Sequence, residues 1–161
     1  MSDHDVTDRQ IAAFRRFLTL LPHGKDRRLV VLQAHLLIEE QLRQLVSERL
    51  KNTRAMEEAD LDFHQCACLA QSFFPPDHLP WVWAGVKKLN KIRIDIAHRL
   101  EPKGLQDRMD DLVNSFPSGF KEFDNEISRF ELTLWSLFTA VSDLVETPSA
   151  KIVPLRATDD E

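Results

Sequence analysis

FKEFDNEISRFELTLWSLFTAVSDL, residues 120 to 144, carries the most regular apolar pattern of the chain. Its apolar residues follow one another at alternating steps of three and four positions, which places them along one side of an α-helix. We therefore predict a helix that starts near Ser118 and packs its apolar side against a partner. That partner is either the rest of the same bundle or the same helix of a second copy. The apolar positions are Phe120, Phe123, Ile127, Phe130, Leu134, Leu137, Val141 and Leu144.

Other segments of the chain also have the apolar spacing of an α-helix. Thr7 and Gln10 have the spacing of a capping box, which predicts a helix start at residue 7. Residues 52–60 are charged and poor in apolar side chains, so we expect a connection or a weak helical turn there. The other predicted helices cover residues 7–21, 26–51, 62–74 and 80–102, and residues 105–116 can add a short one.

Length and composition bound the fold class. The chain has 161 residues, of which 43% are hydrophobic, with only four Gly and no Tyr. These values fit one helical domain and argue against a turn-rich β fold. We predict an all-α bundle of about five helices over residues 1–147, followed by a flexible tail at 148–161. The predicted core contains Phe123, Ile127, Phe130, Leu134, Leu137, Ile38, Leu42, Ile92 and Ile96.

Charge and hydropathy exclude several classes of protein. The formal net charge is -5, so contact with a nucleic acid would need a local basic patch. The chain has no apolar run of about 18 residues, the length that a membrane span requires. It starts with the polar stretch MSDHDVTDRQ, which is unlike a secretory signal. We expect a cytoplasmic protein that does not enter a membrane.

The two cysteines give no sign of a disulfide or a metal site. Cys66 and Cys68 are two residues apart in a predicted helix, so their side chains point to nearly opposite sides. His64 and Cys68 share one helix face, but a zinc site needs three or four ligands. We therefore expect buried structural thiols and neither a metal nor another cofactor.

KIRIDIAHRLEP, residues 91 to 102, places an arginine and a histidine near the end of a predicted helix. Leu89, Ile92, Ile96 and Leu100 form its predicted buried stripe. Arg93 and His98 lie about 140° apart around an ideal helix. His98 falls instead on a second stripe with Lys87, Lys91 and Ile94. A purely structural interpretation pairs Arg93 with a carboxylate such as Asp95 and places His98 favourably at the helix C-terminus.

The stretch NKIRIDIAH, residues 90 to 98, resembles the signature of the HEPN superfamily of α-helical bundles. In that signature an Arg is followed after four to six residues by a His, usually within an LRN…H phrase near the end of a long helix. Arg93 and His98 match this motif. The chain length and the upstream stretch HLLIEEQLRQLV also resemble the HEPN-like group that includes the mannitol repressor family. The resemblance covers roughly residues 25 to 146 in pattern, and only the short motif is specific.

The resemblance implies metal-independent cleavage of RNA by a toxin or defence protein. A histidine moves a proton and a guanidinium holds phosphate oxygens, which assigns these catalytic roles to His98 and Arg93. It also implies a homodimer whose two motifs face each other, with Lys87 and Lys91 as RNA-binding residues. An antitoxin or a nucleotidyltransferase is an expected further partner.

Two alternatives remain at this stage. Active relatives often carry a polar residue such as Asn directly after the arginine, where this chain has Ile94. That difference favours a non-catalytic HEPN-like module for interaction or regulation. The third interpretation is an unrelated helical bundle in which Arg93 and His98 are structural.

Overall fold

The computed structural model describes residues 6–117 and 126–147, which form seven α-helices and no β-strand. This confirms the all-α prediction, with more helices than the five expected. The charged segment after the second helix forms a short helix, which the Asn52 side chain caps. The short helix that residues 105–116 could add is also present. The helices are α1 (Asp8–Leu20), α2 (Arg27–Ser47), α3 (Thr53–Glu58), α4 (Phe63–Ser72), α5 (Pro80–His98), α6 (Leu105–Asn114) and α7 (Glu126–Glu146).

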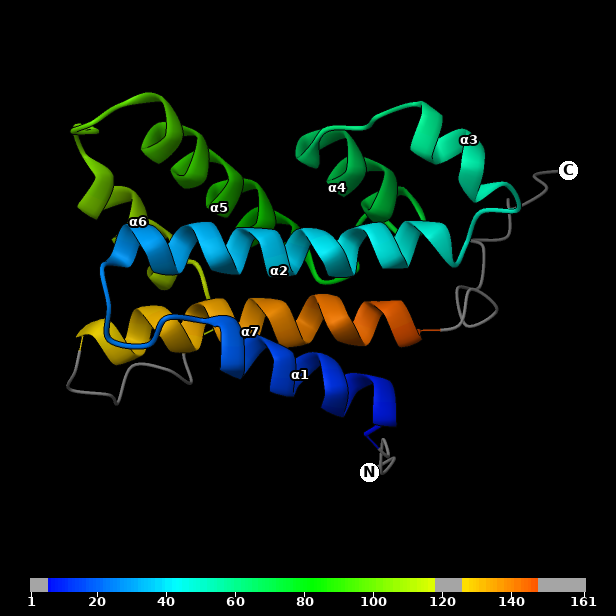
Figure 1. Ribbon diagram of the computed structural model, residues 1–161, viewed down its shortest axis with the longest axis horizontal. Coiled ribbons are helices and arrows are strands. Elements are labelled where there is room, and N and C mark those ends of the chain that lie inside the picture. Colours follow the sequence, from blue (N-terminus) through cyan, green and yellow to red (C-terminus); the bar gives the residue numbers. More distant parts are fainter. Residues whose placement is uncertain (1–5, 118–125, 148–161) are drawn as a thin grey trace, which may run out of the picture.

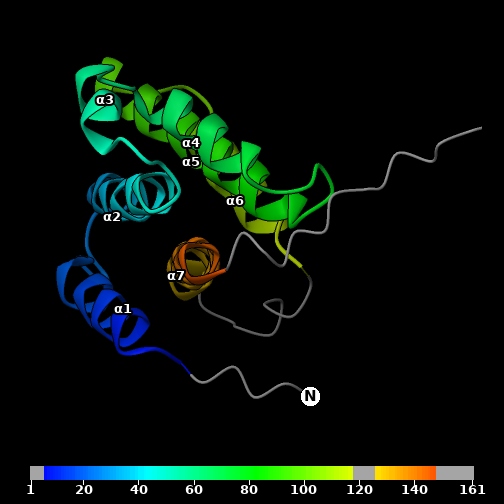
Figure 2. The same ribbon diagram turned by 90° about the vertical axis from the view of Figure 1, so that its right-hand side faces the viewer.

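The helices form three layers. α2 and α7 lie side by side at the centre and run in the same direction (Figure 1). Arg49, just after α2, donates hydrogen bonds to the carbonyls of Leu144 and Thr147 at the end of α7, at 2.9 and 2.7 Å. α1 covers this central pair on one side, and α4, α5 and α6 cover it on the other (Figure 2).

The apolar side of α7 packs inside the bundle. Leu134 and Leu137 are fully buried, so the described part of this stripe, from Phe130 to Leu144, packs within the chain. Ile38, Leu42, Phe130 and Ile92 are buried as predicted, and Ile96 is partly buried against the same core. The predicted start of the helix at Ser118, with Phe120 and Phe123, lies outside the described residues, as do the side chain of Ile127 and the predicted tail at 148–161.

The end of α5 differs from the prediction. The helix ends at His98, and Arg99 has an extended backbone with φ −138° and ψ 129°. Leu100 was predicted to belong to the buried stripe, and it is 93% exposed. The reason is that a residue beyond the helix end no longer follows the helical period. Its carbonyl instead accepts a hydrogen bond from the Arg28 guanidinium at 2.8 Å, which ties this end of α5 to the start of α2.

Local signals in the sequence explain where the helices begin. The predicted capping box of Thr7 and Gln10 is present at the start of α1. Asp62 caps α4, as expected from its position before the apolar run. Pro80 occupies the first turn of α5. Among the helices of residues 6–117 and 126–147, none combines the length and the apolar content that a membrane span requires.

Candidate functional site

Helix α5 has a packed beginning and a more open end. Its buried side chains, Val82, Trp83, Val86, Leu89 and Ile92, all lie in the first part of the helix. Beyond them, in residues 93–98, no side chain is fully buried. We call these residues the outer end of α5. Ile94 is 40% exposed there, and His98 is exposed as well.

Arg93 is half-buried at the edge of the packed face. The structural interpretation paired Arg93 with Asp95. The Asp95 carboxylate instead forms an ion pair with Arg108 of α6, at 2.7 Å. Within residues 6–117 and 126–147, the Arg93 guanidinium forms no hydrogen bond or ion pair. The positive charge of Arg93 is therefore available to an anionic ligand.

His98 occupies the last turn of α5, where a cation interacts favourably with the helix dipole. It too has no hydrogen-bond partner among the described residues. Because Arg93 and His98 lie on one helix about 140° apart, a single chain does not direct both at one phosphate. Lys91 is exposed, whereas the Lys87 ammonium donates a hydrogen bond to the Gln71 side chain of α4 at 3.2 Å.

A buried histidine that was not predicted from the sequence lies next to this site. His35 of α2 is 2% exposed, and its Nε2 lies 3.1 Å from the Asn90 Oδ1 of α5. The ring stacks on Phe63 of α4, with centroids 4.0 Å apart. The sequence does contain a signal for its burial. His35 follows Val31 by four residues and precedes Ile38 by three, which places it on the buried stripe of α2.

The surroundings of His35 lower its pKa and so favour the neutral imidazole. Burial lowers the pKa of His35 most strongly, and the positive charge of Arg93 lowers it further. The hydrogen bond to Asn90 opposes these effects on the pKa. The other ring nitrogen, Nδ1, is buried and has no hydrogen-bond partner in the described part of the chain. His35 and Arg93 are thus electrostatically coupled.

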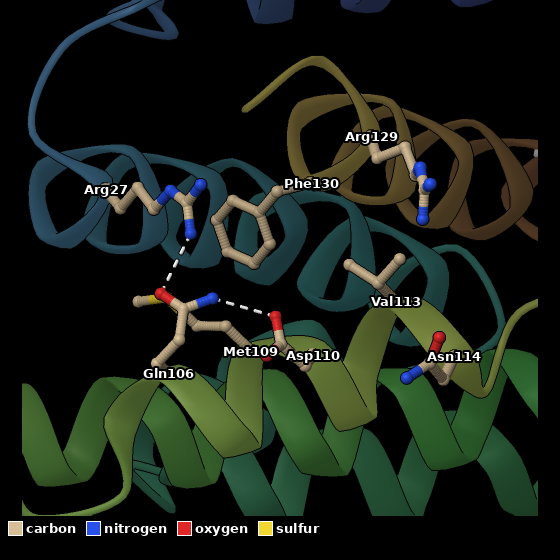
Figure 3. A pocket seen from close by; sticks show the side chains of 8 residues that line it. All are labelled: Arg27, Gln106, Met109, Asp110, Val113, Asn114, Arg129 and Phe130. Atoms are coloured by element: carbon tan, nitrogen blue, oxygen red, sulfur yellow. Dashed lines mark hydrogen bonds between the residues drawn. The ribbon is translucent and has the colours of Figure 1, made fainter. Parts of the chain in front are cut away.

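Two cavities on the described surface lie elsewhere. The first, of about 230 Å³, lies where α2, α6 and α7 meet (Figure 3). Arg27 donates a hydrogen bond to Gln106 at 2.9 Å, and Gln106 donates one to Asp110 at 2.8 Å. The second, of about 430 Å³, lies between α2 and α3, with Arg43 and Asp60 in its lining. Neither cavity is lined by Arg93 or His98.

The cysteines only partly fit the prediction of buried thiols. Cys66 is buried, whereas Cys68 is exposed, because it lies on the outward side of α4. The Cys68 Sγ is 3.6 Å from the His64 Nε2, so these two side chains do share one face. In the part of the chain that the structure describes, no three His, Cys, Asp or Glu side chains gather as metal ligands would.

Comparison of the chain with protein-family models, with curated proteins and with solved structures found no match. The functional interpretation therefore depends on Arg93, His98 and their surroundings on α5.

Proposed function

We propose that this chain is a HEPN-like, metal-independent endoribonuclease of the toxin or defence type that acts as a homodimer in the cytoplasm. The proposal is supported by the lack of partners for the Arg93 and His98 side chains within the described residues. Both side chains lie on the outer end of α5, and neither is engaged in an ion pair or hydrogen bond with another described residue. A phosphate-binding cation and a proton-transfer group must both be free to meet RNA.

The chemistry needs no group beyond these side chains. His98 accepts the proton of a ribose 2′-hydroxyl while its oxygen bonds to the adjacent phosphorus. The bond from phosphorus to the 5′-oxygen breaks, the leaving oxygen takes a proton from the solvent, and His98 then releases its proton to the solvent. The Arg93 guanidinium stabilises the charge on the phosphate oxygens as it develops. The products are a 2′,3′-cyclic phosphate and a 5′-hydroxyl.

A second copy solves the geometric problem of the single chain. Two outer ends of α5 related by a two-fold axis would bring Arg93 of one copy near His98 of the other. Ile94 lies between them in sequence, and its 40% exposed side chain would gain cover in such an interface. Lys87 and Lys91 would be doubled by the symmetry, which gives a local basic surface for RNA on an acidic protein.

The test is cleavage of a mixed RNA substrate in the presence of EDTA. Wild type should cut, and Arg93→Ala and His98→Ala should each lower the rate by about 10²-fold or more, because proton transfer and charge stabilisation are each worth about that much. Arg54→Ala and His64→Ala are matched controls, because both residues are exposed and lie on other helices. Wild type that leaves all RNAs intact, or equal loss in the controls, would contradict the proposal.

One observation favours a second candidate, a non-catalytic HEPN-like module that binds a protein such as an antitoxin or a nucleotidyltransferase. Ile94 occupies the position that is often polar in active relatives, and its apolar side chain is partly exposed. If wild type is inactive and Ile94→Asn cleaves RNA, the site has lost its activity through this one position, and the second candidate is favoured.

A further inference from the structure

Three helices meet at the His35 ring. It belongs to α2, stacks on Phe63 in the first turn of α4, and hydrogen-bonds Asn90 of α5 at 3.1 Å. The ring is 2% exposed, so this contact is made away from water. A buried hydrogen bond between side chains of two helices fixes their relative position more strictly than apolar contact alone.

This contact lies directly before the outer end of α5. Asn90 precedes Arg93 by three residues, so the two side chains lie on the same side of the helix, one turn apart. After Asn90, α5 is held on its α6 side by the ion pair of Asp95 with Arg108. Toward α2, the next hydrogen bond among the described residues is made by Arg28 to the carbonyl of Leu100, beyond the helix end.

We propose that His35 and Asn90 are positioning residues for Arg93, because their hydrogen bond fixes the turn of α5 from which the guanidinium projects. The inference rests on the proposed function, in which Arg93 holds the phosphate. His35 and Asn90 act through Arg93, and neither needs to touch RNA.

Electrostatics supports this assignment. The charged groups that act on His35 are Arg93 of α5 and Glu39 of α2, and Glu39 is itself paired with Arg43 at 2.7 Å. α4 presents the uncharged ring of Phe63. Neutral His35 can donate from Nε2 to Asn90, whereas a protonated ring would add a second positive charge beside Arg93. The titration of His35 therefore reports how close Arg93 lies.

The experiment follows the His35 imidazole by NMR during a pH titration of four proteins: wild type, Arg93→Gln, Asn90→Ala and the double variant. Arg93→Gln removes a nearby positive charge, so the titration midpoint of His35 should move to higher pH. Lys91→Gln is the matched control, because this exposed lysine also lies on α5 and is not among the charges that shift the pKa of His35. The control should leave the midpoint in place.

The decisive comparison is between the two backgrounds. If Asn90 positions Arg93, the upward shift caused by Arg93→Gln should be smaller in the Asn90→Ala background. An equal shift in both backgrounds, or no shift at all, would overturn the proposal. Asn90→Leu, which preserves most of the volume, replaces Asn90→Ala if the latter fails to fold.

A second measurement links the positioning to RNA cleavage. In an active protein, Asn90→Ala should lower kcat by up to about 10²-fold with little change in KM, since a small displacement of a catalytic group has this effect. An unchanged kcat would overturn the proposed link to catalysis. A wild type that cuts no RNA would instead remove the proposed function, and the NMR comparison would still decide whether Asn90 positions Arg93.

Discussion

His35 and His23 show how the surroundings of one side chain set its protonation. His35 is buried, which lowers its pKa, and the nearby charge of Arg93 adds to that effect. His23 lies at the surface, and its Nδ1 is 2.9 Å from the Glu131 carboxylate. That hydrogen bond raises the pKa of His23. The two histidines therefore influence the pH dependence of stability in opposite directions.

The first prediction concerns that pH dependence between pH 7.5 and 5.5. The folded pKa of His35 lies below its ordinary value of 6.5, so below pH 6.5 the unfolded chain binds more protons at this residue. His35 thus makes the fold less stable as the pH falls. Urea unfolding should show that His35→Gln loses less stability than wild type between the two pH values.

His23 provides the control of opposite sign. Its folded pKa lies above 6.5, so its contribution to stability is fully present below pH 6.5 and is lost as the pH rises through the folded pKa. His23→Gln should therefore lose more stability than wild type when the pH falls to 5.5. If the two variants have the same pH dependence, the assigned environments of these histidines are wrong.

The second prediction concerns the centre of α7. Leu134 is fully buried, so Leu134→Ala removes apolar contacts and leaves a cavity. We expect the free energy of unfolding to fall by about 2 to 5 kcal/mol in denaturant titrations. Leu36→Ala is the matched control, because Leu36 is 54% exposed, and it should change the value by no more than about 0.5 kcal/mol. Equal effects of the two variants would place Leu134 outside the core.

At the scale of elements, Arg49 joins the ends of two central helices to the segment after α4. Its guanidinium donates to the carbonyls of Leu45, Leu144 and Thr147, at 3.1, 2.9 and 2.7 Å. It also lies over the rings of Phe73 and Phe74, 6.0 and 5.3 Å from their centroids. These contacts satisfy backbone carbonyls that a helix end leaves without partners.

The third prediction follows from this cluster. Arg49→Met keeps the apolar stem and removes every donor, so the carbonyls of Leu144 and Thr147 lose their hydrogen bonds from the guanidinium, and Leu144 keeps only the Thr147 N–H at 3.3 Å. We expect a loss of about 1 to 3 kcal/mol in the free energy of unfolding. Faster amide hydrogen exchange in the last turns of α2 and α7 than in their centres should accompany it. Arg54→Met, at an exposed position of α3, is the control, and an equal loss there would contradict the role of Arg49.

The sequence predicted the existence of most helices better than their ends. The apolar periods of α2, α5 and α7 are strong because each helix contributes one side to a common core. The predicted end of α5 was wrong. The apolar Leu100 continues the sequence pattern of the buried stripe, but the backbone leaves the helical conformation at Arg99. The contact of His35 with Asn90 was missed, because it depends on how α2 and α5 pack, which no local pattern specifies.

At the scale of the whole molecule, the proposed homodimer uses the outer end of α5. The apolar side of α7 from Phe130 to Leu144 is buried inside the bundle, so this described part is not part of the proposed interface. The partly exposed Ile94 and the exposed Leu100 are apolar side chains at the outer end of α5 and just beyond it. Burying such residues is a common source of association energy between identical chains.

The fourth prediction tests this interface. Ile94→Asp places a charge on the proposed contact surface, so it should weaken association before it affects folding. Light scattering over a range of concentrations should give a dimeric mass for wild type and a monomeric mass for the variant, with the same helical circular dichroism. Ile11→Asp is the control, because Ile11 is 38% exposed on α1, away from α5. A monomeric wild type at high concentration would contradict the proposed dimer.

A catalytic site shared between two copies is tested by mixing two inactive variants. If one site combines Arg93 of one copy with His98 of the other, then Arg93→Ala and His98→Ala each fail alone. Mixed after unfolding and refolding together, they form heterodimers in which one of the two sites is intact. RNA cleavage in EDTA should then return to about a quarter of the wild-type rate, as random pairing in a two-fold dimer requires. A mixture as inactive as either variant alone, beside an active wild type, would contradict a site shared between two copies.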